Sequence, residues 1–279
     1  MKVFYTPRMV VADAQSYSPS AAKPKQVVES WLASGFPIQI IQPKPVTREQ
    51  LYRAHSQEYV DGVLSLKIRN GFGNTLKSVA KSLLYTNGSM LAAAHEALLS
   101  KSITCSPTSG FHHAHWHKGS AYCTFNGLMV TTLDLLEIGI ATKIGILDCD
   151  MHYGDGTQHI IDTLGVADAI VHFSVGETPH NPNTFLSCLE EKILELYSEC
   201  DILLYQAGAD PHVDDPLGGW LSTQQLMQRD KIVFDTARLM NLPVTWNLAG
   251  GYQRDSFGSI SPVLEIHDNT MRVGVIDTD

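Results

Sequence analysis

The sequence predicts a single α/β domain in which a mainly parallel sheet lies between layers of helices. Two observations predict this class. Apolar runs of strand length alternate with helical patterns along the chain, and such alternation produces parallel strands joined by crossover helices. In addition, no linker, low-complexity tract or internal repeat divides the 279 residues. Residues 1–279 are therefore expected to form one domain.

The amino-terminal part of the chain predicts two strands and two helices. Strands are expected at Val3–Tyr5 and Pro37–Ile41. A helix near Pro24–Ala33 separates them, and Gly35 can terminate it because glycine readily adopts the conformation that ends a helix. The residues Thr47–Gln50 match a capping box, in which two side chains bond free backbone N–H groups, so another helix should begin there.

The rest of the chain contains the clearest strands. Helix formers are frequent at Ser89–Leu99 and Leu128–Glu137. Continuous apolar runs, typical of strands covered on both faces, lie at Ile144–Asp148, Ala169–Phe173, Ile202–Gln206 and Val244–Leu248. Helical patterns between them lie at Thr157–Leu164, Phe185–Ser198 and Thr223–Met240. Ligand sites form at the carboxyl ends of parallel strands, so polar residues just after these strands are the functional candidates.

Composition excludes several functional classes. The chain has 20 Lys and Arg residues against 29 Asp and Glu residues, a net charge of −9. This balance argues against nucleic-acid binding, which needs clustered basic residues, and favours a cationic or neutral small substrate. No apolar run approaches the roughly 18–20 residues that cross a bilayer, and the first residues do not resemble a secretory signal. Five scattered cysteines indicate a reducing, cytoplasmic location.

The first candidate site follows the strand at Ile144–Asp148. Because side chains alternate across a strand, Asp148, Asp150 and His152 project to one side. Converging ionisable groups are costly unless their charge is compensated, and Asp with His suits a divalent transition metal. Asp155 follows in a glycine-rich turn. The alternative interpretation is that these carboxylates cap the next helix.

Three further segments carry candidate residues. One strand runs into an acidic, turn-rich loop that contains Asp210 and Asp215, for which a solvated loop is the alternative. The adjacent His112 and His113 could supply a base and an electrostatic partner, or belong to a surface metal-scavenging tract. Paired glycines before Tyr252 form either a plain turn or a place where backbone and phenol approach a ligand closely.

Four motifs together identify a resemblance to a known family. In chain order, GFHHA, LDCDMHYGDGTQ, GADPHVDDPLGG and NLAGGY resemble the zinc-dependent histone deacetylase superfamily, which includes acetylpolyamine amidohydrolases and acetoin-utilisation proteins. The similarity spans Ser109–Tyr252, and the HSQEYV stretch that begins at His55 is similar to the family's amino-terminal part. The resemblance implies a three-layer α/β/α arginase/deacetylase-like fold, in agreement with the predicted sheet.

The resemblance also implies which residues hold metals. The family's zinc ligands correspond to Asp150, His152 and Asp215, where Asp215 is chosen because it directly precedes a proline. The oxygen-rich ligand set suits Fe²⁺ as well as Zn²⁺. A structural potassium ion is expected at Asp148 and Ser174 by the same correspondence.

Catalytic roles follow from the same resemblance. His113 corresponds to the general base and acid, His112 to an electrostatic partner and Tyr252 to the residue that polarises the carbonyl. Their carboxylate partners are Asp148 for the first histidine and Asp155 for the second. Tyr122 corresponds to an aromatic residue that lines the acyl-lysine channel.

The chain departs from the family at a few places. Residues 175–200 form a short segment of 26 residues where many relatives have a long loop beside the substrate tunnel. The resemblance therefore does not predict the wall of the tunnel on this side. Tyr153 stands where a second histidine is common. His115, Trp116 and His117 have no family counterpart with a role, and we expect them to be solvent-exposed or at the rim rather than metal ligands.

The sequence thus predicts a metal-dependent amide hydrolase that removes an acetyl or short acyl group from acetyl-lysine or acetylpolyamine. Two alternatives are a catalytically silent homologue that binds acylated ligands and, less favoured, a binuclear ureohydrolase-type enzyme. The ureohydrolase is disfavoured because His112, His113 and Tyr252 stand at its second-metal positions. The acyl group, the amine and any homo-oligomer are left undetermined.

Overall fold

A computed structural model describes residues 1–177 and 181–275. Across these residues the strands form one sheet with the order β2-β1-β3-β7-β6-β4-β5, and every neighbouring pair is parallel. The strands are β1 Lys2–Phe4, β2 Gln39–Ile41, β3 Ile103–Ser106, β4 Ile144–Asp148, β5 Ile170–Ser174, β6 Ile202–Gly208 and β7 Val244–Ala249. The predicted α/β class with a parallel central sheet is confirmed.

Helices connect the strands as the alternating pattern predicted. They are α1 Lys23–Ala33, α2 Arg48–Ala54, α3 Gln57–Leu64, α4 Lys77–Ser100, α5 Gly127–Glu137, α6 Asp155–Leu164, α7 Pro182–Tyr197, α8 Thr223–Leu239 and α9 Ser261–Val275. The capping box predicted at Thr47 opens α2, and a second one at Ser222 opens α8. None of the helices in the described ranges is both long and apolar enough to cross a membrane.

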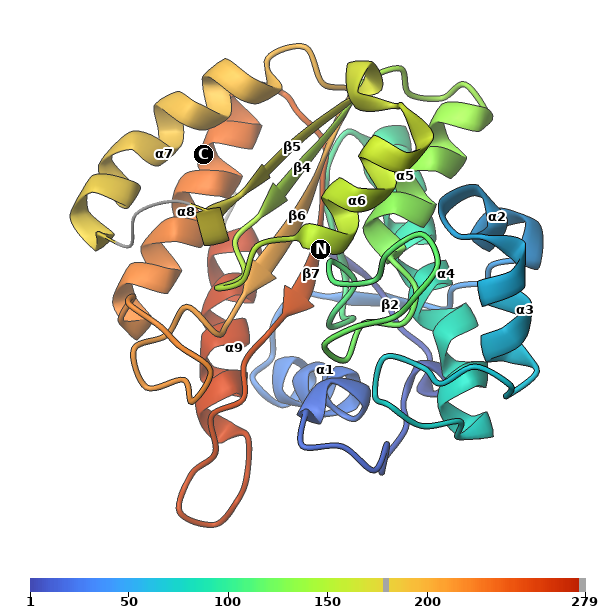
Figure 1. Cartoon of the computed structure of the whole chain (residues 1–279). Coiled ribbons are helices and arrows are strands. Elements are labelled where there is room, and N and C mark those ends of the chain that lie inside the picture. The colour runs from blue at the N-terminus through green and yellow to red at the C-terminus, as the bar shows by residue number, and fades with distance from the viewer. Residues whose placement is uncertain (178–180, 276–279) are drawn as a thin grey trace.

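The helices cover both faces of the sheet (Figure 1). Core residues of α2 to α6 pack together with Ile144 and Ile146 on one side, whereas those of α1, α7, α8 and α9 pack together with Leu147 on the other. Alternate residues of β4 thus enter different layers, as strand geometry requires. The three-layer architecture follows from this division.

Three of these strands and helices were not predicted, and several others begin at residues other than the predicted ones. Strand β3 has the short, partly polar sequence ITCS, in which Thr104 is buried and its hydroxyl lies 2.9 Å from that of Thr245 in β7. Helix α9 packs on α8 and α1, and α3 is only eight residues long. Helix α4 begins twelve residues before the predicted Ser89, and β1 begins one residue earlier than predicted.

Candidate active site

The candidate residues meet beyond the carboxyl ends of β3, β4, β6 and β7. The loops that leave these strands enclose a narrow cavity of about 90 Å³. Its lining includes His112, His113, Tyr122, Asp150, His152 and Tyr252. The candidate residues thus converge at the carboxyl ends of the strands, where the strand-end rule predicts a ligand site.

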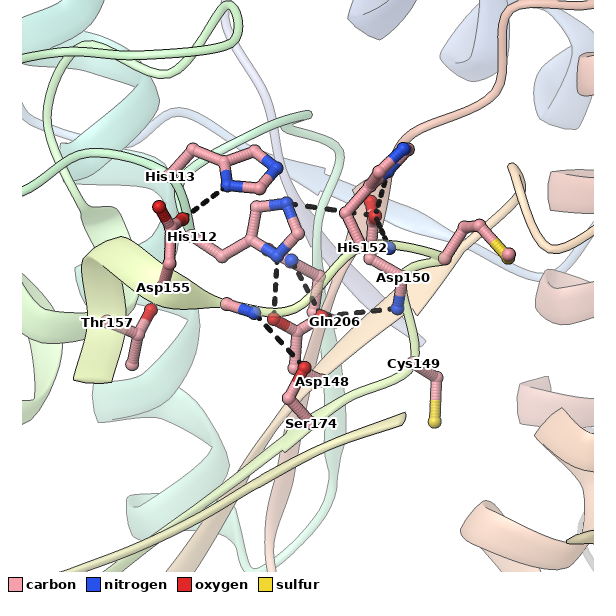
Figure 2. A network of polar contacts seen from close by, with 12 residues as sticks. His112, His113, Asp148, Cys149, Asp150, His152, Asp155, Thr157, Ser174 and Gln206 are labelled. Atoms are coloured by element: carbon pink, nitrogen blue, oxygen red, sulfur yellow. Dashed lines mark hydrogen bonds and ion pairs between the residues drawn. The ribbon is translucent and has the colours of Figure 1, made fainter. Parts of the chain in front are cut away.

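Asp148 anchors the buried side of this site. It is the last residue of β4 and is fully buried. One carboxylate oxygen accepts a hydrogen bond of 2.7 Å from Nδ1 of His112, while the other accepts from Gln206 Nε2 at 2.9 Å and from the backbone N–H of Asp150 at 3.2 Å. Figure 2 shows this network. Asp148 is thereby held in one orientation by three donors.

His112 is surrounded by carboxylates. Burial alone would lower the pKa of His112, but the negative charges of Asp148, Asp150 and Asp210 raise it to about 9. The side chain is only 3% exposed. His112 is therefore an imidazolium near pH 7 in the metal-free chain.

His113 has the opposite charge preference. Its Nδ1 donates to Asp155 at 2.5 Å, and its ring centroid lies 4.0 Å from that of His112. Burial and the positive charge of His112 lower the pKa of His113, against the opposing influence of Asp155. In Figure 2 the two rings lie side by side and turn toward different carboxylates. A neutral imidazole is what a general base requires.

A group of potential metal ligands lies beside the two histidines. Within the described ranges, ligand atoms of Asp150, His152 and Asp210 all fall within 4.8 Å of one another. Nδ1 of His152 lies 3.2 Å from an Asp150 oxygen and 3.1 Å from an Asp210 oxygen. Burial and the charge of Asp150 raise the pKa of Asp210 to about 7. Two buried carboxylates with one imidazole form a donor set that fits a divalent cation.

Asp215, the expected third zinc ligand, lies outside that close group. One of its oxygens accepts from the backbone N–H of Tyr252 at 2.8 Å and the other from that of Leu217 at 3.0 Å. Burial raises the pKa of Asp215, and its carboxylate lies near enough to the centre for Asp150 to raise that pKa further and for Lys23 to lower it. The structure therefore adds Asp210, which the sequence placed in the same loop as Asp215, to the potential metal ligands.

Lys23 was missed altogether by the sequence analysis. This first residue of α1 is fully buried, and its Nζ donates to the carbonyl of Gly250. Burial lowers the pKa of Lys23 to about 8, while Asp210, Asp150 and Asp215 oppose the shift. Its ammonium group compensates part of the negative charge. A lysine at the start of a helix carries no sequence signal for such a position.

Tyr252 lies over the cavity at the end of the loop that leaves β7. Burial, together with Asp150 and Asp210, raises the pKa of the Tyr252 phenol, so the hydroxyl stays protonated and can donate. The ring of Tyr122 lies 6.0 Å away between centroids. Gly250 has a φ of +48°, and a Cβ there would collide with the Asp210 carboxylate. The paired glycines thus permit the close backbone approach that the sequence suggested.

The remaining predicted residues take different positions. Ser174 is the β5 partner of Asp148 in register, and its hydroxyl accepts from the backbone N–H of Gly154 at 3.1 Å. His117 is exposed as expected. His115 is less exposed, with 13% of its side chain exposed, and its Nε2 lies 3.2 Å from an Asp155 oxygen, a contact that was not predicted. Neither joins the group of potential metal ligands found in the described part of the chain, which disfavours a metal-scavenging tract.

Comparisons with known proteins agree with this geometry. The family model of the histone deacetylase domain matches residues 19–184 and 171–264. An uncharacterized protein of Picosynechococcus is 29% identical over 243 residues, which cover 78% of this chain and 80% of that protein. Histone deacetylase 2 of Arabidopsis thaliana is 26% identical, over 86% of this chain and 69% of its own length.

Two more relatives extend the comparison. Acetoin utilization protein AcuC of Staphylococcus aureus is 25% identical, over 65% of this chain and 57% of its own length. The crystal structure of the HDA15 HD domain superposes with a TM-score of 0.80 at 18% identity, covering all of this chain and 92% of the other, which shows a shared fold. With the family model matching most of its length, the chain belongs to the histone deacetylase domain family.

Proposed function

We propose that the chain is a metal-dependent amide hydrolase that removes an acetyl or short acyl group from an acylated amine such as acetyl-lysine or acetylpolyamine. The observation that supports this most is the pair of adjacent histidines. His112 and His113 favour opposite charge states beside a group of carboxylates suited to a divalent cation. The net charge of −9 favours a cationic amine product.

The proposed metal is Zn²⁺, with Fe²⁺ as the alternative, held by Asp150, His152 and Asp215. When bound, such an ion polarises a carbonyl and lowers the pKa of water. The geometry also supports Asp210 as the second carboxylate ligand in place of Asp215. Metal affinities of Asp215→Asn and Asp210→Asn distinguish the two, and we expect the larger loss in Asp215→Asn.

The chain's own residues would divide the proton transfers among them. Nδ1 of His113 donates to Asp155, so Nε2 is the nitrogen that accepts a proton from the attacking water and returns it to the leaving amine. Asp155 orients that ring. His112, paired with Asp148, contributes positive charge, and the Tyr252 hydroxyl donates to the oxyanion that develops on the substrate.

Three further assignments complete the proposal. Asp148 and Ser174 would hold a structural potassium ion, since they are neighbours at the ends of β4 and β5. Tyr122 would line the acyl channel opposite Tyr252. All five cysteines are free thiols in the structure, which supports a cytoplasmic location.

The experiment that tests the proposal is a substrate panel. Metal-loaded protein is incubated with acetylated polyamines, acetyl-lysine peptides and small acetamides, and acetate and free amine are quantified. We expect both products in equal amounts from at least one class. Binding of these compounds without acetate release would favour the silent homologue, and urea release from guanidino compounds would favour the ureohydrolase.

A further inference from the structure

We propose that His115 is a positioning residue that acts on His113 through Asp155. The two oxygens of the Asp155 carboxylate face two different imidazoles: one lies 2.5 Å from Nδ1 of His113 and the other 3.2 Å from Nε2 of His115. The inference rests on the proposed function, in which His113 is the general base. It assigns a role to a histidine for which the family resemblance implies none.

The surroundings of His115 select the tautomer that can donate. Its Nδ1 is buried and has no hydrogen-bond partner within the described part of the chain. A buried N–H without an acceptor is rarer in proteins than a buried acceptor without a donor, so the proton belongs on Nε2, which faces Asp155. Burial also lowers the pKa of His115, which keeps the ring neutral near pH 7. A neutral donor orients Asp155 and leaves its charge available to His113.

Other contacts fix His115 itself. Its carbonyl accepts from Nδ1 of the buried His55 at 2.9 Å, and Nε2 of His55 accepts from the backbone N–H of Asn126 at 2.9 Å. The ring of His115 packs edge-on against that of His159, with 4.9 Å between centroids. Backbone and side chain are therefore both held, as a support for another residue requires.

The need for such a support follows from the exposure of Asp155. Its side chain is 47% exposed at the first residue of α6, where water competes for its oxygens. Asp148, by contrast, is fully buried, and Gln206 and the backbone of Asp150 hold its second oxygen. His115 would do for Asp155 what Gln206 does for Asp148. Each histidine would then face a carboxylate that a further donor orients.

Matched variants separate the hydrogen bond from the bulk of the ring. His115→Phe keeps an aromatic ring beside His159 and removes the donor, whereas His115→Gln restores an N–H near the position of Nε2. His117→Phe is the control, because His117 is exposed and has no contact with Asp155 among the interactions of the described residues. We expect His115→Phe to lower kcat by about 10- to 100-fold with little change in KM, a range typical of residues that support an active-site side chain. His115→Gln should recover most of that loss, and His117→Phe should match the wild type.

A second measurement needs no activity. In the metal-free protein, the Nδ1 proton of His113 should give a low-field NMR signal that His113→Gln removes. His115→Phe should shift or broaden this signal, and His115→Gln should restore it. If the wild type hydrolyses no acylated amine but the signal responds in this way, the role of His115 stands and the proposed function fails. A wild-type kcat and an unchanged signal in His115→Phe would overturn the inference, as would His115→Gln behaving like His115→Phe.

Discussion

The two adjacent histidine–aspartate pairs have the same chemistry but different surroundings. In each pair Nδ1 of the histidine donates to a carboxylate, at 2.7 Å for His112 and Asp148 and at 2.5 Å for His113 and Asp155. The first pair is almost fully buried, whereas the side chains of the second are 17% and 47% exposed. Yet the buried histidine has the raised pKa and the more exposed one the lowered pKa.

The carboxylate that accepts a hydrogen bond from an imidazole therefore does not by itself determine the charge of that imidazole. His112 faces the additional carboxylates Asp150 and Asp210, and their attraction outweighs the cost of burial. For His113, burial and the positive charge of His112 outweigh the attraction of Asp155 and Asp150. His112 thereby carries a fixed positive charge, whereas His113 stays neutral and can act as a base.

The largest expected effect comes from removing one histidine of each pair. His113→Gln should lower kcat by about 10²- to 10⁴-fold, because it removes the group that transfers protons. His112→Gln should cost less, because His112 acts by charge. Steady-state kinetics at neutral pH measure both, with metal content determined for each variant. A greater loss in His112→Gln would reverse the assigned roles.

Replacing the carboxylate of the buried pair should mainly lower stability, whereas replacing that of the exposed pair should mainly lower activity. Asp148→Asn leaves a buried imidazolium without its main partner and should lower the free energy of unfolding by about 3–5 kcal/mol. Asp155→Asn, on the more exposed pair, should change that free energy by less than about 1 kcal/mol while it reduces kcat. Urea unfolding of the metal-free variants tests this. Equal losses of stability would mean that the two pairs do not differ as described.

Tyr252 belongs to neither pair and supplies the third catalytic contact. Tyr252→Phe should lower kcat by about 10²- to 10³-fold, because a donor to the developing oxyanion is lost. Metal content and KM should stay close to the wild-type values. Wild-type turnover in this variant would reject the assigned role of the phenol.

His55 extends the comparison because it is buried and no carboxylate in the described part of the chain acts on its pKa. Burial lowers the pKa of His55 to about 4, so the unfolded chain binds more protons than the folded chain between about pH 6.5 and 4. The stability that the neutral ring contributes is thus present above pH 6.5. It should be lost as the pH falls, by about 2–3 kcal/mol near pH 4.5.

Urea unfolding at several pH values measures the contribution of His55. His55→Gln should show a shallower decline in stability than the wild type between pH 6.5 and 4.5. Because the buried His267 also has a lowered pKa, some decline should persist in the variant. Identical slopes in the two proteins would contradict a neutral His55 in the folded chain.

The fold was predictable where one local pattern dominated. The bounds of β4 were predicted to the residue, and the capping box at Thr47 forms as expected, because these signals reside in short segments. Strand β3 was missed because it is short and partly polar, and Thr104 finds a hydroxyl partner in Thr245, far away in the sequence. Pairing across the sheet is information that a local pattern does not contain.

The site was predictable in its members but not in its electrostatics. Motifs and strand ends brought His112, His113, Asp150, His152 and Tyr252 to one cavity. They did not reveal Lys23, whose burial depends on the packing of α1, or the contact of Asp155 with His115, which was expected at the surface or the rim. Both residues act through contacts with segments far away in the sequence. Their positions could be learned only from the folded chain.

The proposal that the chain is a deacetylase dependent on one divalent metal ion is best tested by measuring acetate release as a function of added metal per chain. The metal-free protein is titrated with Zn²⁺, and separately with Fe²⁺ under anaerobic conditions, in the presence of an acetylated substrate found in the panel. We expect that the metal-free protein is inactive, that activity rises in proportion to the added metal, and that it saturates at one equivalent per chain. Saturation at two equivalents, or metal binding at one equivalent without acetate, would contradict it.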